Sequence, residues 1–424
     1  MKTAATLAPA LRDAARMVAR VASGRSLVDQ FRRAAEGGES ARAALLDLTH
    51  GTLRRYGLVQ GIVAALSRRG PPDPLVQALL WCALYALQSG RYAEYTVVDQ
   101  AVRATSLLER WPAKAYVNGV LRTYLRSRDA LEATLRANEE ARHQHPQWWI
   151  ELVRGAYPER WGEILAAGNA HPPMTLRVNA RRIAPADYLK RLAEAGIAAS
   201  AAGDAAILLE KPVPVERLPG FADGEVSVQD AGAQRAAGLL DLAPGQRVLD
   251  ACAAPGGKSA HILERADVAL TAIDADAERC ERVMRNLARL SLRAEVRAAD
   301  CTRPQTWWDG ERFARILADV PCSASGVARR HPDLKWLRRA GDAAAFALRQ
   351  AAILDALWQL LAADGKLLYV TCSVFPQENQ EVVQAFLART PGARPLPLPD
   401  GKESQWLPGP GHDGFFYALI QKHA

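Results

Sequence analysis

The chain lacks any apolar run of the roughly 18 residues that a membrane-spanning helix needs. Its beginning does not have the pattern of a signal peptide either, because Arg12, Asp13, Arg16 and Arg20 interrupt the apolar residues as in an amphipathic helix. Low-complexity tracts are absent, and hydrophobic residues make up 49% of the chain, an ordinary share for a protein with apolar cores. We therefore expect a folded, cytoplasmic protein without a membrane partner.

The six cysteines are scattered, and none of them shows C-x-x-C spacing. We therefore expect neither a disulfide framework nor a metal site. In a reducing compartment a cysteine is usually a small buried apolar side chain, and we expect this of Cys82 and Cys280. Any other role for a cysteine has to be argued from its position.

Acidic residues are in deficit only in the first third of the chain. Residues 1–144 contain 21 Lys+Arg and 13 Asp+Glu, whereas the remaining residues contain 33 of each. The whole net charge of +8 therefore lies in this first third. Such asymmetry indicates a polyanion as partner, although composition alone is equally consistent with a solvated helical surface.

A length of 424 residues predicts two or three domains. Residues 1–142 are predicted to be helical almost throughout, and apolar residues recur there at three- and four-residue spacing, as at Val117, Val120, Leu121 and Tyr124. Residues 143–235 predict a small α+β connector. Its expected elements are strands at 175–179 and 206–209 and a helix at 184–195.

In the third domain, residues 236–424, short apolar runs alternate with amphipathic stretches such as 275–290 and 342–361. This alternation predicts an α/β domain with a doubly wound parallel sheet. Ligands bind such sheets at the carboxyl ends of the strands, so the chemistry is expected just after those ends. The expected strands are 247–250, 269–274, 293–297, 314–319 and 366–371.

A glycine-containing loop, Asp250-Ala-Cys-Ala-Ala-Pro-Gly-Gly-Lys-Ser259, follows the first of these strands. It lacks the G-x-G-x-x-G of a dinucleotide site, and a P-loop fits only its tail, because the required first glycine falls at Cys252. An S-adenosylmethionine site fits better, with Asp274 accepting from the ribose hydroxyls and Asp300 reaching the adenine edge. Taken singly, each acid is better explained as a helix cap, but three acids at successive strand ends favour a ligand site.

Two cysteines, Cys322 and Cys372, directly follow expected strands, so both should lie at the ligand-binding edge. Carbon 5 of cytosine is too poor a nucleophile to attack a sulfonium methyl, but a thiolate that adds to carbon 6 makes it reactive. Two thiols at this edge therefore favour a pyrimidine methylase. Asp319 is expected near ring nitrogen 3, as an acid if it is protonated. The spacing does not say which cysteine attacks.

Three segments, D-A-C-A-A-P-G-G-K, D-V-P-C-S-A-S-G and T-C-S-V-F-P-Q-E-N, occur in this order. Together they resemble the RNA 5-methylcytosine methyltransferases of the NOL/NSUN/Sun class, and the likeness extends over the whole chain. The basic first third, with Leu-Thr-His-Gly-Thr-Leu-Arg-Arg-Tyr at 48–56, looks like a NusB-type RNA-binding domain. The resemblance implies a Rossmann-like methyltransferase domain at 236–424 and a monomer that methylates cytosine in RNA, with 16S rRNA as the expected substrate.

The resemblance also implies roles for individual residues. Cys372 is expected to be the nucleophile, and Cys322 is expected to promote product release. Ser259 and Ser325 stand where threonine is common in the family, which keeps the hydroxyl. The expected cofactor contacts are Cys252, Ala253, Ala254, Pro255, Gly256, Gly257, Lys258, Asp274, Asp300 and Asp319.

A basic and partly aromatic stretch, 329–336, follows the Cys322 loop. Arg329, Arg330 and Lys335 are expected to hold RNA phosphates, with a solvated loop around a packed Trp336 as the alternative. The target cytosine is expected to be single-stranded or flipped out of its stack. A tRNA methylase, a catalytically idle RNA-binding or assembly factor and a P-loop NTPase remain the other candidate functions.

Overall fold

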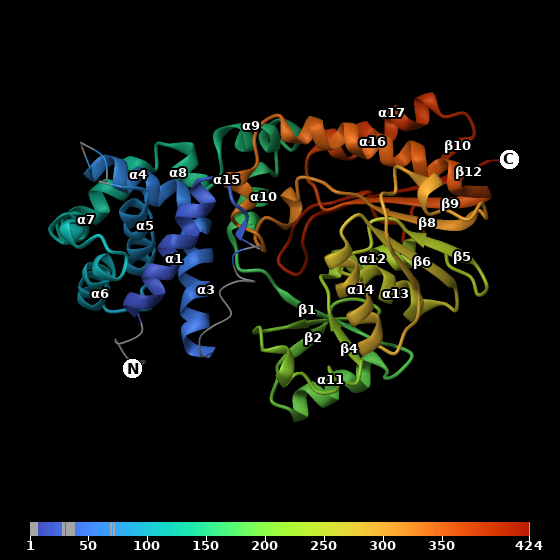
Figure 1. The fold of residues 1–424 in the computed structure, drawn as a ribbon, viewed down its shortest axis with the longest axis horizontal. Helices are drawn as coiled ribbons and strands as arrows, with labels where there is room; N and C mark the ends of the chain where they lie inside the picture. Colours follow the sequence, from blue (N-terminus) through green and yellow to red (C-terminus); the bar gives the residue numbers. More distant parts are fainter. Residues whose placement is uncertain (1–6, 28–29, 31–38, 68–69, 71–72, 424) are drawn as a thin grey trace. The chain divides into compact units, whose positions relative to one another are not determined.

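The computed structural model describes residues 7–27, 30, 39–67, 70 and 73–423. They form two compact units, one of Met1–Ala170 with Ala328–Ala340 and the other of His171–Val327 with Gly341–Ala424 (Figure 1). No helix among these described residues has the length and apolar character needed to cross a membrane.

The first unit is helical throughout its described residues. Its central helix is α5 (Pro74–Ser89), which begins at Asp73, where the side chain caps the Val76 N–H, and which is buried along most of its length. A helix that is apolar nearly all round needs neighbours on every side, and α1, α3, α4, α6 and α7 contact it. The bounds are α1 (Leu7–Ala22), α3 (Glu39–Arg54), α4 (Tyr56–Leu66), α6 (Glu94–Leu107), η2 (Trp111–Ala113), α7 (Lys114–Leu135), α8 (Glu139–His143), α9 (Gln147–Ala156), α10 (Trp161–Asn169) and α15 (Leu334–Leu337).

The apolar stripe expected in the first domain is confirmed on α7, where Val117, Val120, Leu121 and Tyr124 are buried. Cys82 is buried in the same core and behaves as expected of a small apolar side chain. The boundary expected at residue 142 differs from the observed division, because α9 and α10 belong to the helical unit.

The second unit contains a small antiparallel sheet with the order β2-β3-β1-β4. The expected strands and helix of the connector are found here, at β1 (Met174–Val178), β3 (Ala206–Leu209) and α11 (Pro185–Glu194). Sequence analysis missed the two short outer strands. These are β2 (Ala199–Ala201) and β4 (Val226–Val228), and a short helical turn, η3 (Val215–Arg217), precedes β4.

The large sheet of this unit has the order β10-β12-β9-β8-β5-β6-β7, with β11 paired to β12. Five strands, from β9 to β7 in this order, are parallel, as predicted. Three antiparallel strands that were not predicted extend this parallel sheet at one edge: β12 pairs antiparallel with β9, and β10 and β11 pair antiparallel with β12. The bounds are β5 (Arg247–Asp250), β6 (Ala269–Asp274), β7 (Glu295–Ala298), β8 (Phe313–Asp319), β9 (Leu361–Thr371), β10 (Ala393–Leu396), β11 (Gln405–Trp406) and β12 (Phe415–Lys422).

Helices cover both faces of the large sheet (Figure 1). Alternate residues of each strand point to opposite faces, so Leu249 and Tyr369 pack in one apolar cluster with α16 and α17, whereas Val248 and Val370 pack in another with α12, α13 and α14. The doubly wound prediction is therefore confirmed. The helices and helical turns are α12 (Ala231–Leu239), α13 (Gly257–Arg265), α14 (Ala277–Arg289), η4 (Pro304–Thr306), η5 (Ser325–Val327), α16 (Asp342–Leu360), η6 (Pro376–Glu378) and α17 (Gln380–Arg389).

Candidate active site

The glycine loop connects the end of β5 to the first turn of α13. Gly256 precedes the helix with φ +93°, a left-handed conformation that favours glycine, and a Cβ there would lie 3.1 Å from the Val283 Cα. Because Gly256 has no side chain, no side chain of this residue caps α13. The first N–H groups of a helix have no partner within the helix, so this end of α13 is suited to a negatively charged ligand group.

Asp274, at the end of β6, is hydrogen-bonded to the backbone of this loop. Its Oδ2 accepts a hydrogen bond from the Ala254 N–H at 3.2 Å, and its Oδ1 accepts from the Asp276 N–H at 3.1 Å. Arg279 lies 3.4 Å from the same carboxylate. The helix cap of α14 is Asp276 and not Asp274, so the capping alternative considered for Asp274 does not apply.

Two further carboxylates, those of Asp250 and Asp319, accept hydrogen bonds from side chains of the loop. Asp250 is fully buried, and burial raises its pKa to about 7, although the hydrogen bond from Ser259 at 2.6 Å acts in the opposite direction. Lys258 donates to Asp319 at 2.6 Å. Burial lowers the pKa of Lys258, but the charge and hydrogen bond of Asp319 outweigh this and raise it above its ordinary value. Lys258 therefore carries a firmly held ammonium beside Asp319.

The two expected cysteines meet at this edge of the sheet. Cys322 follows β8 and Cys372 follows β9, and their Sγ atoms lie 3.3 Å apart. Cys322 is the more buried of the two. Its contact with Cys372, together with burial, raises the pKa of the Cys322 thiol well above its ordinary value. The structure therefore brings together the two sulfurs that the sequence separates by 50 residues.

A buried polar cluster, Ser323, Gln350, Ser373 and Glu378, holds both cysteine loops. Glu378 Oε2 accepts from the Ser323 N–H at 2.7 Å, and Oε1 accepts from the Ser373 hydroxyl at 2.9 Å. Gln350 donates to the Pro321 carbonyl at 2.9 Å and to Glu378 at 3.3 Å. Burial raises the pKa of Glu378, although these hydrogen bonds act in the opposite direction.

Sequence analysis missed this cluster, even though Glu378 belongs to a recognised segment. One carboxylate contacts the residue that follows each cysteine, so Glu378 fixes both loops at once. The only signal in the sequence was the presence of an acid six residues after Cys372. Its importance depends on burial, which the sequence does not show.

Most of the expected cofactor contacts in residues 252–258, and Asp300, are at least partly exposed to solvent. Cys252, Ala254, Gly257 and Lys258 are half-buried, Ala253 and Gly256 are buried, and Pro255 is exposed. Asp300 follows β7 with an exposed side chain that accepts from the Thr302 hydroxyl at 2.7 Å. This hydrogen bond and that from the Thr302 N–H lower the pKa of Asp300, so it is an ionised acceptor at the sheet edge.

Two of the three expected RNA contacts in the 329–336 stretch, Arg329 and Lys335, are buried. Lys335 is fully buried in the helical unit, where it donates to the Gln144 carbonyl at 2.9 Å and to Asn169 Oδ1 at 2.6 Å. Arg329 is 2% exposed, and Arg330 is half-buried. A phosphate cannot reach these buried side chains, so Arg329 and Lys335 have an internal structural role.

The packed-tryptophan alternative describes this stretch better. Trp336 packs against the helical core, where its Nε1 donates to the Leu53 carbonyl at 2.9 Å and its ring centroid lies 5.0 Å from that of Tyr56. Asp333 accepts from the Leu27 N–H at 2.9 Å. These contacts join the stretch to α3, to α4 and to Leu27, which follows α1 in the chain.

Comparison with known proteins agrees with the three parts of the chain. Residues 237–421 match the family described as 16S rRNA methyltransferase RsmB/F, residues 145–216 match the ferredoxin-like domain of RsmF/B-like methyltransferases, and residues 10–126 match the NusB family. The expected NusB-type domain and methyltransferase domain are thereby confirmed.

Curated relatives match the chain over nearly its whole length. Ribosomal RNA small subunit methyltransferase B of Pseudomonas putida is 46% identical over 97% of this chain and 98% of the relative. The protein of the same name from Pseudomonas syringae is 44% identical over 90% of each. The crystal structure of PH0851 has a TM-score of 0.78 and 23% identity, and the match covers 93% of this chain and 94% of that one, which supports the fold.

Proposed function

The chain belongs to the RsmB/F family of 16S rRNA methyltransferases, and from this we propose that it transfers a methyl group to carbon 5 of a cytosine in 16S rRNA. The relatives bear the name of a small-subunit rRNA methyltransferase and match nearly the full length of this chain. An rRNA substrate also fits a cytoplasmic location.

S-adenosylmethionine fits the glycine loop as the methyl donor. Among the described residues, Asp250 Oδ1 is a buried oxygen without a hydrogen-bond partner, and the first turn of α13 has no side-chain cap from Gly256. The backbone of residues 252–258 would hold the amino-acid end of the cofactor, Asp274 the ribose and Asp300 the adenine. When bound, the cofactor supplies an electrophilic methyl group.

The close sulfur pair is the observation that carries the proposal. Because Cys322 is the more buried thiol and its pKa is raised, it keeps its proton and can donate a hydrogen bond to the Cys372 sulfur. Cys372 is then the sulfur that attacks carbon 6 as a thiolate. This assignment of Cys372 as the nucleophile and Cys322 as its partner agrees with the roles that the family resemblance implies.

Bond formation at carbon 6 places negative charge on the pyrimidine ring, which an acid near nitrogen 3 would stabilise. We expected Asp319 to be that acid, but in the structure it accepts a hydrogen bond from the Lys258 ammonium. We therefore propose that the Lys258 ammonium stabilises this charge by donating a hydrogen bond to the ring, and that Asp319 holds Lys258 in place. The carboxylate can also accept from the amino group of cytosine, which would select cytosine over uracil.

Release of the product needs the reverse elimination. The proton on carbon 5 leaves to a base, the bond between carbon 6 and the Cys372 sulfur breaks, and the sulfur departs as a thiolate. Cys322 lies 3.3 Å from that sulfur and can donate a hydrogen bond to the departing thiolate. Without Cys322 the covalent adduct should persist.

A methyl-transfer assay tests the proposal directly. Purified protein with methyl-labelled S-adenosylmethionine should label unmethylated 16S rRNA, and bisulfite sequencing should locate the product at one cytosine. The matched control is bulk tRNA from the same strain. Label in tRNA alone would favour the tRNA methylase, and label in neither RNA would favour a catalytically idle binding protein.

A further inference from the structure

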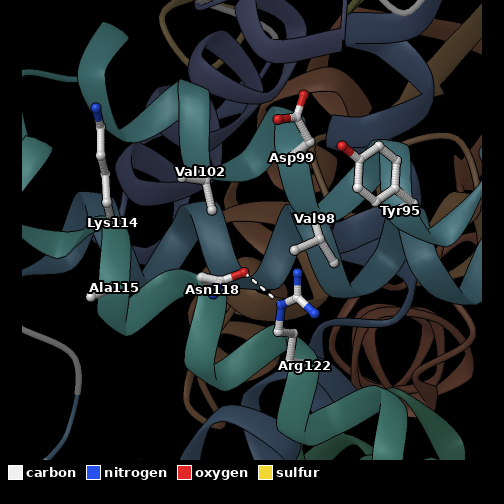
Figure 2. A pocket seen from close by; sticks show the side chains of 8 residues that line it. All are labelled: Tyr95, Val98, Asp99, Val102, Lys114, Ala115, Asn118 and Arg122. Carbon is white, nitrogen blue, oxygen red and sulfur yellow. Dashed lines mark hydrogen bonds between the residues drawn. The ribbon is translucent and has the colours of Figure 1, made fainter.

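A groove of about 350 Å³ lies between α6 and α7 of the helical unit (Figure 2). Val98 and Val102 of α6 form its apolar floor, and polar side chains from both helices form its rim. Figure 2 shows the Arg122 side chain extending from α7 toward Val98. The residues that line the groove are Tyr95, Val98, Asp99, Val102, Lys114, Ala115, Asn118 and Arg122.

The α7 side of the groove carries a basic stripe. Lys114, Asn118, Arg122 and Arg126 recur every fourth residue and therefore lie on one face of the helix, over about 18 Å at about 1.5 Å per residue. The three cations are exposed. Arg122 Nε donates to Asn118 Oδ1 at 3.0 Å, which uses only one of the five N–H donors of the guanidinium.

The single acid that lines the groove is already paired. Asp99 lies 3.1 Å from Arg103 and accepts from Gln100 at 2.9 Å. Its charge is therefore offset within α6 itself, and the cations of α7 set the charge of the groove. A negatively charged ligand fits this arrangement.

Two exposed aromatic side chains accompany the basic stripe. Tyr95, which lines the groove, is 78% exposed, and Trp111, three residues before Lys114, is 67% exposed. No other aromatic side chain among the described residues is exposed to this degree. Flat rings beside cations suit unpaired bases, which stack on aromatic side chains.

We propose that this groove docks a single-stranded segment of the RNA substrate, with Lys114, Arg122 and Arg126 on phosphates and Tyr95 and Trp111 stacked on bases. The inference rests on the proposed function, because it assumes that the substrate is RNA. It replaces the 329–336 stretch as the expected RNA contact. The groove lies in the part of the chain that holds all the excess positive charge.

Removal of the aromatic rings tests the stacking contacts. In the full-length protein, Tyr95→Ala and Trp111→Ala should each weaken binding of a single-stranded oligouridylate and of an unmethylated 16S rRNA transcript by about five-fold or more. The KM for the transcript should rise with kcat unchanged, because neither residue belongs to the unit that carries the cysteines. Both side chains are exposed, so thermal unfolding should remain as in the wild type.

Removal of the charges tests the phosphate contacts. The double variant Lys114→Gln/Arg122→Gln should reduce the slope of log affinity against log salt by about 0.7 for each phosphate that the protein no longer neutralises. The matched control is Arg16→Gln/Arg20→Gln, which removes the same charge from exposed positions on α1 and should leave the slope unchanged.

Equal losses of affinity in the control and groove variants, or wild-type RNA affinity in all of them, would overturn the docking site. So would groove variants that bind naked RNA normally but fail to bind the precursor particle, since this would mean a protein partner. The proposed function fails separately, if the wild-type protein methylates no rRNA. Wild-type methylation with unaffected groove variants removes only the groove inference.

Discussion

The Cys322 and Cys372 sulfurs lie 3.3 Å apart at the ends of neighbouring parallel strands. Glu378 accepts from the residues that follow both cysteines, so one buried carboxylate sets the spacing of the two thiols. The pair is unequal, because Cys322 is the more buried. This inequality gives each thiol a separate expected phenotype.

Replacement of Cys372 with alanine should abolish methyl transfer, because the neighbouring Cys322 is the more buried thiol and its pKa is raised, so it is a poor nucleophile. The rate of label transfer from S-adenosylmethionine to 16S rRNA should fall to background. Binding of RNA should remain, since the helical unit is unchanged. Full activity of Cys372→Ala would mean that the roles of the two cysteines are reversed.

Replacement of Cys322 with alanine should leave attack possible and slow product release. The protein should accumulate as a covalent adduct with RNA, visible as a shifted band on a denaturing gel. The double variant Cys322→Ala/Cys372→Ala is the control and should give no band. Rapid turnover by Cys322→Ala without an adduct would remove Cys322 from the release step.

The strand ends that carry this chemistry could be predicted from the sequence. Asp250, Asp274, Asp319 and Thr371 end their strands at the predicted positions, because a polar residue after a short apolar run is a local signal. The last strands were not predicted. The pairing of β12 between β9 and β10 depends on contacts between residues far apart in the chain, and no local pattern indicates it.

The interpretation of charged residues from sequence was less successful for the same reason. Lys335 has the composition of an RNA contact, but its partners Gln144 and Asn169 lie 191 and 166 residues away. Glu378 was passed over because only its burial beneath two loops reveals its role. A charged side chain is interpreted correctly only when its surroundings are known.

Glu378 accepts hydrogen bonds from both cysteine loops, so its replacement should misplace the two cysteines. Glu378→Gln replaces one acceptor oxygen with an amide, so either Ser323 or Ser373 loses its partner. Loss of a hydrogen bond to a charged group costs about 1.5–3 kcal/mol, and kcat should fall by about ten-fold or more while the KM for RNA changes little. Glu381→Gln, an exposed change of the same charge on α17, is the control. Wild-type kcat in Glu378→Gln would show that the loops hold their spacing without the carboxylate.

The buried carboxylate of Asp250 predicts a pH-dependent stability. Its pKa is about 7 in the folded chain and about 3.9 when unfolded. Between these values the folded state binds more protons than the unfolded state, so Asp250 lowers stability progressively as pH rises from about 4 to 7 and by a constant amount above. The full shift of about 3 units corresponds to about 4 kcal/mol.

Asp250→Asn removes the titration and can still accept a hydrogen bond from Ser259. In the absence of cofactor its Tm should exceed that of the wild type, and the difference should grow from pH 5 to 7 and then level off. The control is Asp267→Asn, whose carboxylate is exposed. A difference independent of pH would show that Asp250 does not carry the shift.

Replacement of the buried Lys335 distinguishes a structural role of this residue from a role in RNA binding. Burial lowers the pKa of Lys335 well below its ordinary value, and its hydrogen bonds satisfy the Gln144 carbonyl and Asn169 Oδ1. Lys335→Met fills similar space but leaves both oxygens without their donor, which should lower the free energy of unfolding by about 1–3 kcal/mol. RNA affinity and its salt slope should stay at wild-type values, as measured by filter binding of the 16S rRNA transcript at a temperature well below the Tm of both proteins. A folded Lys335→Met protein with weakened, less salt-dependent RNA binding would return this residue to the RNA interface.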